Sequence, residues 1–229
     1  MRILIYTKKL LVGSIPHGAM GSMSDGIGNQ QLAPAASRSM QSKTKALRQT
    51  LLATAEKFFA GMGYDSISLA TIEAAAKAPK NVIPYHFGSK ANLWREAANF
   101  IFQPIKAKVD ALATHADAPV DAKQIVETFV EISAAHPEVA QLIFQEAKAQ
   151  SWRLEYLVSH QSKPLLAAIE KASGQRVSPH QYYFLVGAGS APFTARYECL
   201  ALFGVDPQER SFIDLHTSTL KRLIDGASS

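Results

Sequence analysis

The chain has 229 residues, 47% of them hydrophobic, and a formal net charge of +5 at pH 7. This length suffices for one large domain or two small ones with a buried core, and no apolar run approaches the ~18 to 20 residues of a membrane span. A single cysteine, Cys199, excludes an intrachain disulfide framework and a cysteine-based zinc site. We therefore expect a cytoplasmic protein with no membrane partner and no cofactor.

The positive charge is concentrated near the N-terminus. Residues 1–48 contain seven basic side chains and one acidic residue, Asp25. Residues 1–42 show no sustained hydrophobic period, so we expect a disordered basic arm or an extended start. Such an arm favours a polyanionic partner, nucleic acid before membrane, and a solvated tail is the alternative.

A helix-turn-helix unit is predicted over residues 44–87. Apolar residues at helical spacing predict a first helix of about 18 residues from Thr44. Ser68 can cap a short second helix that ends at Ala76, and after a tight turn a third short helix is predicted over 80–87. Two short helices joined by a tight turn and packed on a longer one describe this unit.

The rest of the chain is also predicted to be helical. Ser89 can cap a long fourth helix. Ser178-Pro179 and Asp206-Pro207 each place a capping side chain before a proline at the first helical position. No segment shows sustained alternation of apolar and polar residues, so no sheet is expected. The predicted fold class is all-α, with about nine helices.

Three short motifs occur one after another within residues 55–90. They are Ala55-x-x-x-Phe59-x-x-x-Gly63, the run from Ile72 to Ala76, and Tyr85-x-Phe87-x-Ser89-Lys90. In this order and spacing, residues 44–96 resemble the DNA-binding domain of the tetracycline-repressor (TetR/AcrR) family of transcriptional regulators. The resemblance implies a three-helix DNA-binding head over 43–96 and a larger helical effector-binding and dimerisation domain over 97–229.

The third helix carries the candidate DNA contacts. A helix can enter the major groove, its N-terminal N–H groups favour phosphate, and nearby lysines neutralise the DNA backbone. In the family, the third helix and the lysine after it touch the operator, which the resemblance carries over to Lys80, Asn81, Val82, Tyr85, His86 and Lys90. We assign Lys80 and Asn81 to base edges, because both can hydrogen-bond there, and Tyr85, His86 and Lys90 to phosphates. The alternatives are solvated surface charges for the lysines and a half-buried, backbone-bonded His86.

Three residues depart from the family's pattern. Lys77 stands where the turn usually has glycine, which asks a lysine to adopt a less favoured backbone conformation. Pro79 replaces the usual capping residue of the third helix. Pro84 falls inside the predicted helix, where proline costs about 3 kcal/mol because it removes an N–H and clashes with the carbonyl of Lys80. A 3₁₀-like first turn can relieve the clash, so we expect a distorted helix that still reads DNA.

The resemblance also implies that the last two helices, about 179–203 and 207–225, pair with their copies in a homodimer. Two reading heads about one DNA turn apart would match a palindromic operator. We expect a pocket for a small apolar or amphipathic effector, lined by Phe100, Phe129, Phe144, Trp152, Tyr156, His160 and Tyr197. The alternative for aromatic residues at helical spacing is a place in the core.

Two interpretations of the function remain open. The first is a homodimeric repressor that leaves its operator when an effector moves the reading helices away from one-turn spacing. The second is a helical ligand-binding or protein-interaction module that has lost sequence-specific DNA binding. Lys77, Pro79 and Pro84 motivate it, as does Ala70, where a polar groove contact is expected. The histidines and acidic residues form no metal-binding pattern, and no enzymatic activity is expected.

Overall fold

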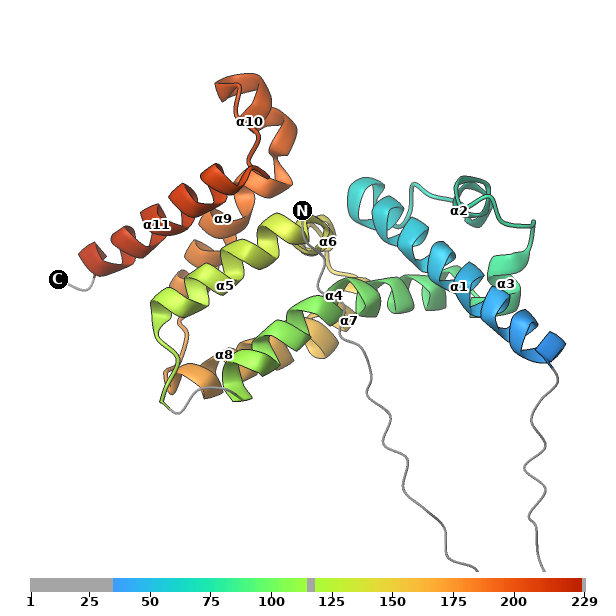
Figure 1. Cartoon of the computed structure of the whole chain (residues 1–229), viewed down its shortest axis with the longest axis horizontal. Coiled ribbons are helices and arrows are strands. Elements are labelled where there is room, and N and C mark those ends of the chain that lie inside the picture. The colour runs from blue at the N-terminus through green and yellow to red at the C-terminus, as the bar shows by residue number, and fades with distance from the viewer. Residues whose placement is uncertain (1–34, 115–117, 228–229) are drawn as a thin grey trace, which may run out of the picture.

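The computed structural model describes residues 35–114 and 118–227, and these residues form eleven α-helices and one π-helical turn, without a strand (Figure 1). The helices are α1 (Ala35–Met62), α2 (Leu69–Ala75), α3 (Val82–Phe87), α4 (Lys90–Thr114), α5 (Ala122–Ala135), α6 (Pro137–Glu146), α7 (Trp152–Leu157), the π-helical η1 (Val158–Ser162), α8 (Lys163–Ser173), α9 (Pro179–Thr194), α10 (Arg196–Phe203) and α11 (Arg210–Ala227). The predicted all-α class is confirmed. None of the helices in the described ranges is long and apolar enough to cross a membrane.

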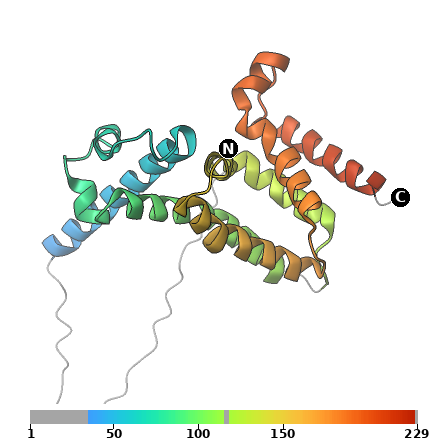
Figure 2. The same cartoon turned by 180° about the vertical axis from the view of Figure 1, so that it is seen from behind.

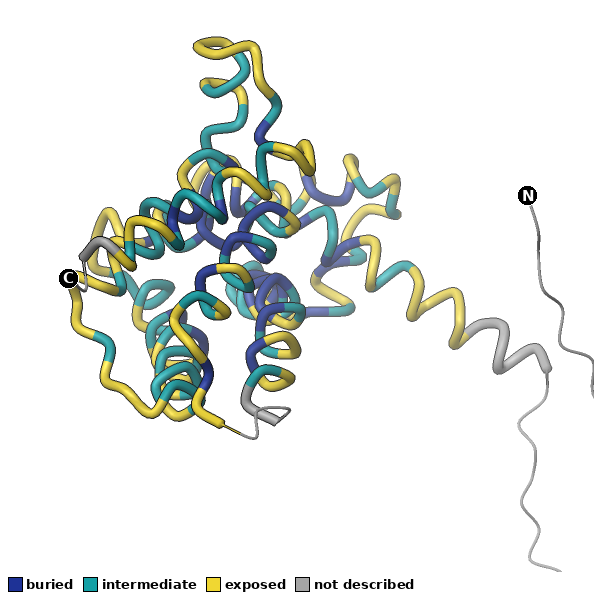
Figure 3. Tube along the Cα trace, turned by 60° about the vertical axis from the view of Figure 1, so that its left-hand side comes forward, coloured by how far each residue is buried: buried dark blue, intermediate teal, exposed yellow. Residues whose placement is uncertain are grey.

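The first helix begins earlier than predicted. Of the arm expected over 1–42, residues 1–34 lie outside the described residues, whereas the residues from Ala35 onward belong to α1. Residues 41–46 are all exposed (Figure 3). Because this part of α1 packs against no core, it has no apolar stripe from which a helix could be predicted.

The sequence predicted two other helix starts from capping side chains, and the structure confirms one of them. The hydroxyl of Ser178 accepts the N–H of Gln181 at 3.3 Å and the Gln181 side chain accepts the N–H of Ser178 at 2.9 Å, which confirms the predicted start of α9. The start predicted just after Asp206 is wrong, since α11 begins at Arg210. The carboxylate of Asp206 accepts the N–H of Gln208 at 3.0 Å and two hydrogen bonds from Arg196 at 2.8 and 2.5 Å, which fixes the loop between α10 and α11.

Helix α4 connects the two parts of the molecule. It packs against α1 and α3 at one end and against α8 further along the chain (Figure 1). The larger core runs through both parts and includes the buried side chains of Phe59, Trp94, Phe102 and Leu157. A second, smaller core joins α5, α9 and α11. The head formed by α1, α2 and α3 therefore shares its main core with the helices behind it.

Candidate nucleic-acid interface and ligand cavity

Helices α2 and α3 form a helix-turn-helix on the outer side of α1 (Figure 1). Ser68 caps α2 as predicted, because its hydroxyl accepts the N–H of Thr71 at 3.1 Å. In the turn, Lys77 has a φ of +52°, the left-handed conformation that the expected glycine would adopt freely. The tight turn therefore keeps its shape with a lysine, at a cost of about 1–2 kcal/mol.

A glutamate that the sequence analysis did not single out holds the start of α3. Glu73 is only 5% exposed, yet its carboxylate accepts the N–H of Asn81 at 3.1 Å and that of Ile83 at 2.9 Å. Asn81, at the N-cap, has a φ of +61° and makes no side-chain capping bond. The carboxylate on α2 thus replaces the cap that Pro79 cannot supply. Two amides that were expected to favour phosphate are therefore already bonded within the protein.

Pro84 does not distort α3. The helix begins at Val82, two residues later than predicted, so Pro84 is its third residue. An N–H in the first turn has no partner within the helix, and the carbonyl of Lys80 lies outside the helix, so neither penalty of an interior proline applies. Residues 82–87 are α-helical rather than 3₁₀, and the carbonyl of Pro84 accepts the N–H of Gly88 at 3.0 Å. The expected distortion is wrong.

The solvent-facing side of α3 carries polar and aromatic side chains. Ile83 and Phe87 are buried, at 0% and 4% exposure, and fix the inner face of the helix. Lys80 and Asn81 are exposed just before the helix, and Tyr85 is 82% exposed on it. These three side chains are therefore accessible from solvent on this side of the head.

The remaining candidate contacts are partly covered. Val82 and His86 are half-buried, and the ring of His86 meets the ring of Tyr85 edge to face at a centroid distance of 5.1 Å. Lys90 starts α4 and its Nζ lies 4.4 Å from the ring centroid of Tyr64. A cation over an aromatic ring keeps its charge while its position is restricted. The contact with Tyr64 thus restricts Lys90 to a position just after α3.

Arg153 on α7 ties the head to the rest of the molecule. Its Nη2 lies 3.2 Å from Asp65 in the loop after α1, and its Nε lies 2.7 Å from the buried carboxylate of Glu146 on α6. Its guanidinium also lies over the ring of Tyr64, at 4.7 Å from the centroid. Arg153 therefore contacts both parts of the molecule.

Three of the aromatic residues expected around a ligand pack instead at this junction. Trp152 meets the buried Trp94 of α4 at a ring-centroid distance of 5.2 Å, and Arg95 covers its face at 4.7 Å. Tyr156 stacks on His160 at 4.2 Å. Trp152 and Tyr156 of α7 pack against the core, which corresponds to the alternative of core packing, whereas His160 on η1 is exposed.

The other expected ligand residues are scattered. Phe100 is half-buried on α4, Phe144 is 40% exposed on α6, and Tyr197 is 82% exposed on α10. Phe129 alone of the expected set lines the cavity described next. Aromatic character was therefore a poor guide to the ligand-binding residues, because the side chains that line the cavity are mostly aliphatic.

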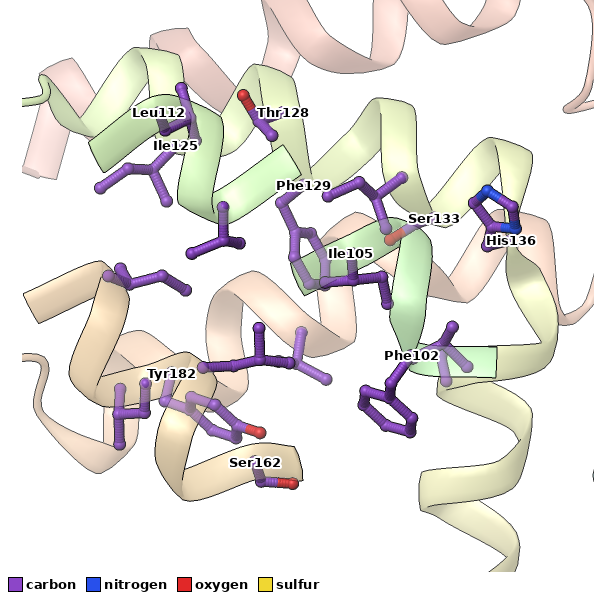
Figure 4. Close-up of a pocket in the computed structure, with 18 of the residues that line it drawn as sticks. Phe102, Ile105, Leu112, Ile125, Thr128, Phe129, Ser133, His136, Ser162 and Tyr182 are labelled. Atoms are coloured by element: carbon purple, nitrogen blue, oxygen red, sulfur yellow. The ribbon is translucent and has the colours of Figure 1, made fainter. Parts of the chain in front are cut away.

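A cavity of about 110 Å³ lies among α4, α5, α6, α8 and α9 (Figure 4). Most of the side chains around it are apolar, and the described residues that line it include no Asp, Glu, Lys or Arg. Ser133 and His136 lie together on one side, and Ser162 and Tyr182 lie together on another. Burial raises the pKa of Tyr182, which hydrogen-bonds to Ser162, so the phenol stays protonated and uncharged. The cavity therefore offers an apolar interior with hydrogen-bonding groups in two corners and a further hydroxyl on Thr128.

A further surface lies on the last three helices. Helix α10 projects away from the body in both views (Figures 1 and 2). Large apolar side chains are exposed on α9, α10 and α11, namely Tyr183, Phe184, Tyr197, Leu202, Phe203, Leu215 and Leu223. A concentration of such side chains is typical of a protein interface rather than of a solvated face.

Comparison with known proteins agrees with this architecture. Residues 51–97 match the model of bacterial regulatory proteins of the tetR family. A transcriptional regulator described as "TerR/AcrR family" from Aquifex aeolicus VF5 has 18% identity and a TM-score of 0.51, covering 77% of this chain and 99% of that one. A HlyIIR mutant protein has 19% identity and a TM-score of 0.46, covering 76% and 94% of the two chains.

A proposed transcriptional regulator from Saccharomonospora viridis, in complex with choline, has 19% identity and a TM-score of 0.49, covering 79% and 96% of the two chains. At these identities the likeness concerns the fold alone. Among curated proteins, no sequence matches the chain. The family match covers the head, so residues 51–97 carry a DNA-binding domain of the tetR family, and the helices behind it share the fold of the Aquifex regulator.

Proposed function

We propose that this regulator is a homodimeric repressor that a small effector releases from a palindromic operator. The observation that carries the proposal is the exposed side of α3, which one long helix, α4, joins to an apolar cavity. In this proposal Lys80 and Asn81 contact base edges, because both are exposed and carry hydrogen-bond donors. Tyr85, His86 and Lys90 contact phosphates and set the position of the helix.

The exposed apolar side chains of α9, α10 and α11 support the homodimer. Tyr183 on α9 and Leu202 and Phe203 on α10 are 69%, 66% and 73% exposed, which is unfavourable for large apolar side chains that face water. A second copy related by a two-fold axis would cover them with the same surface of its own. The two heads would then read two half-sites about one helical turn apart, about 34–36 Å.

The cavity limits the chemistry of the effector. An apolar cavity of about 150 Å³ holds benzene in another protein, and this one measures about 110 Å³. Without a charged side chain in the described lining, a charged ligand would lose its hydration without compensation. We therefore propose a small, uncharged, mainly apolar effector that hydrogen-bonds to Ser133 and His136 or to Ser162 and Tyr182.

Helix α4 is the route from the cavity to the head. Phe102 and Ile105 of α4 line the cavity, while Leu93 and Trp94 of the same helix are buried in the core that includes the head. A ligand that displaces the first pair moves the helix on which α3 rests. A coupling of about 1–3 kcal/mol would lower operator affinity about 5- to 150-fold.

The test is selection of random duplex DNA by the purified protein at near-physiological salt, followed by sequencing. A palindromic motif is expected, and Lys80→Ala should relax the sequence preference at one position in each half-site. Lys90→Ala should weaken binding to all duplexes and reduce the salt dependence. Arg176→Ala, which removes a highly exposed cation in the loop before α9, is the control.

No enriched motif from a folded dimer would reject the proposal. That outcome would favour the alternative, a ligand-binding or protein-interaction module without sequence-specific DNA binding. A motif found with a protein that remains monomeric would reject the homodimer alone.

A further inference from the structure

The loop between α1 and α2 is held by helices outside the head. The backbone of Gly63 approaches α6 so closely that a Cβ at this position would lie 2.6 Å from Nε2 of Gln145. The ring of the next residue, Tyr64, meets the ring of Trp152 on α7 edge to face at a centroid distance of 5.7 Å. The position of Tyr64 therefore depends on how α6 and α7 lie against the head.

Two cations from different parts of the molecule share the ring of Tyr64. The Nζ of Lys90, at the start of α4, lies 4.4 Å from the ring centroid, and the guanidinium of Arg153, on α7, lies 4.7 Å from it. A cation is attracted to the electron-rich face of an aromatic ring. One aromatic side chain of the head thus contacts both the candidate phosphate contact after α3 and a residue of α7.

The two cations differ in how firmly the protein holds them. The side chain of Arg153 is 16% exposed, and it is hydrogen-bonded to the buried Glu146 at 2.7 Å and to Asp65 at 3.2 Å. The ring of Tyr64 is by contrast the only electrostatic or hydrogen-bonding partner that the described residues offer to the ammonium group of Lys90. Arg153 therefore helps to fix the ring, and the ring restricts Lys90.

This restriction leaves Lys90 able to bind an anion. An ammonium group has three N–H donors, and those that are not directed at the ring can reach a phosphate oxygen. A side chain that is already restricted loses less conformational entropy when the contact with DNA forms. The ring thus favours the phosphate contact without touching the DNA.

We propose that Tyr64 is a positioning residue that holds Lys90 for its phosphate contact, and that Arg153 makes this position depend on α7. The inference rests on the proposed function, in which Lys90 contacts a phosphate. A movement of α7 relative to the head would take the guanidinium away from the ring and loosen the loop, so Lys90 would lose its preset position. Operator affinity would then fall even if α3 kept its shape.

A double-mutant cycle separates positioning from packing, because Tyr64 also stacks on Phe59 of α1 at a centroid distance of 5.9 Å. Affinity for the selected operator and for random duplex is measured at constant salt for the wild type, Tyr64→Leu, Lys90→Ala and the double variant. Tyr64→Leu is expected to weaken binding about 2- to 12-fold per head, the fold-change that corresponds to ordering one flexible side chain. In the Lys90→Ala background the same substitution should have little further effect.

The conservative variant Tyr64→Phe keeps the ring and should bind as the wild type does. Equal losses from Tyr64→Leu in both backgrounds would overturn the positioning role, because packing alone would then explain them. Binding by Tyr64→Phe that is as weak as that of Tyr64→Leu would overturn it as well.

A second measurement uses the protein without DNA. Protons that lie over an aromatic ring resonate upfield, so NMR of isotope-labelled lysine reports the position of Lys90, with Lys90→Ala assigning its signal. An upfield shift of the side-chain methylene protons next to Nζ is expected in the wild type and should be lost in Tyr64→Leu. Its absence from the wild type would overturn the contact between the ring and Lys90.

The same signal tests the dependence on α7. Arg153→Met combined with Glu146→Gln, which leaves no buried carboxylate unpaired, should reduce the upfield shift and weaken DNA binding only when Lys90 is present. Arg176→Ala, at an exposed cation before α9, should change neither. An unchanged Lys90 signal in the Arg153 variant would overturn the dependence on α7.

Failure of the proposed function would look different. If no motif were enriched, the proposed function would be rejected, while the lysine signal and the affinities for random duplex would still decide on Tyr64. If Lys90→Ala left binding to every duplex unchanged, the phosphate contact of Lys90 and the positioning role would both be rejected.

Discussion

Glu73→Ala should loosen the start of α3. The substitution removes the acceptor of two N–H groups, those of Asn81 and Ile83. Ile83 is fully buried, so its N–H would be left without a partner at a cost of about 1–3 kcal/mol. Asn81 is exposed and its N–H can turn to water, so the loss there is smaller, about 0.5–1.5 kcal/mol. We expect the free energy of unfolding to fall by about 2–4 kcal/mol in total.

Urea unfolding followed by circular dichroism measures this change. Glu73→Gln keeps one acceptor oxygen and should lose about half as much. Glu155→Ala, at an exposed site on α7, should stay within about 0.5 kcal/mol of the wild type. Operator affinity should fall more than affinity for random duplex, because the proposed base contacts, Lys80 and Asn81, stand directly before α3. If Glu73→Ala unfolded at the same urea concentration as Glu155→Ala, the carboxylate would not be the cap of α3.

Three further predictions concern positions where packing decides the outcome. Pro84→Ala should change the free energy of unfolding by less than about 0.5 kcal/mol, because proline suits a first helical turn; a gain near 3 kcal/mol in urea unfolding would restore the view that this proline strains α3. Arg153→Met should destabilise by about 3 kcal/mol or more, since it leaves the 4% exposed Glu146 unpaired. Adding Glu146→Gln should recover much of that loss in thermal unfolding, and no recovery would contradict the assignment. Gly189→Ala should destabilise by about 1–3 kcal/mol, because its Cβ would lie 2.7 Å from the phenylalanine ring of α5 that lines the cavity. Gly187→Ala meets nothing within 4 Å and is the matched control, so equal effects would refute the close contact.

Features that depend on neighbouring residues were predictable. Ser68 and Ser178 accept hydrogen bonds from N–H groups three residues ahead, so the sequence identifies them as caps. The positive φ of Lys77 follows from the geometry of the turn and was expected from its place in the motif. Helical spacing of apolar residues likewise sufficed for the all-α class.

Contacts between distant residues were not predictable in the same way. Glu73 lies within an apolar stretch of α2, and nothing in its neighbourhood reveals that α3 folds back onto its carboxylate. Trp152, Tyr156 and His160 were chosen as ligand residues because they are aromatic, and the fold places them at the junction with α4. An aromatic side chain suits a core and a pocket equally well, so its place depends on the helices that meet there.

The sequence by itself determined that the head has three helices with a tight turn between the second and the third, because short-range hydrogen bonds and apolar spacing specify them, and its motifs carried the resemblance to the family. Only the tertiary structure decided that Pro84 falls in a first turn, that Phe129 alone of the expected ligand residues lines the cavity, and that Glu73 caps α3. The physical reason is that burial, hydrogen bonds between helices and cavity walls arise where separate helices pack together, and the sequence alone does not show which helices those are.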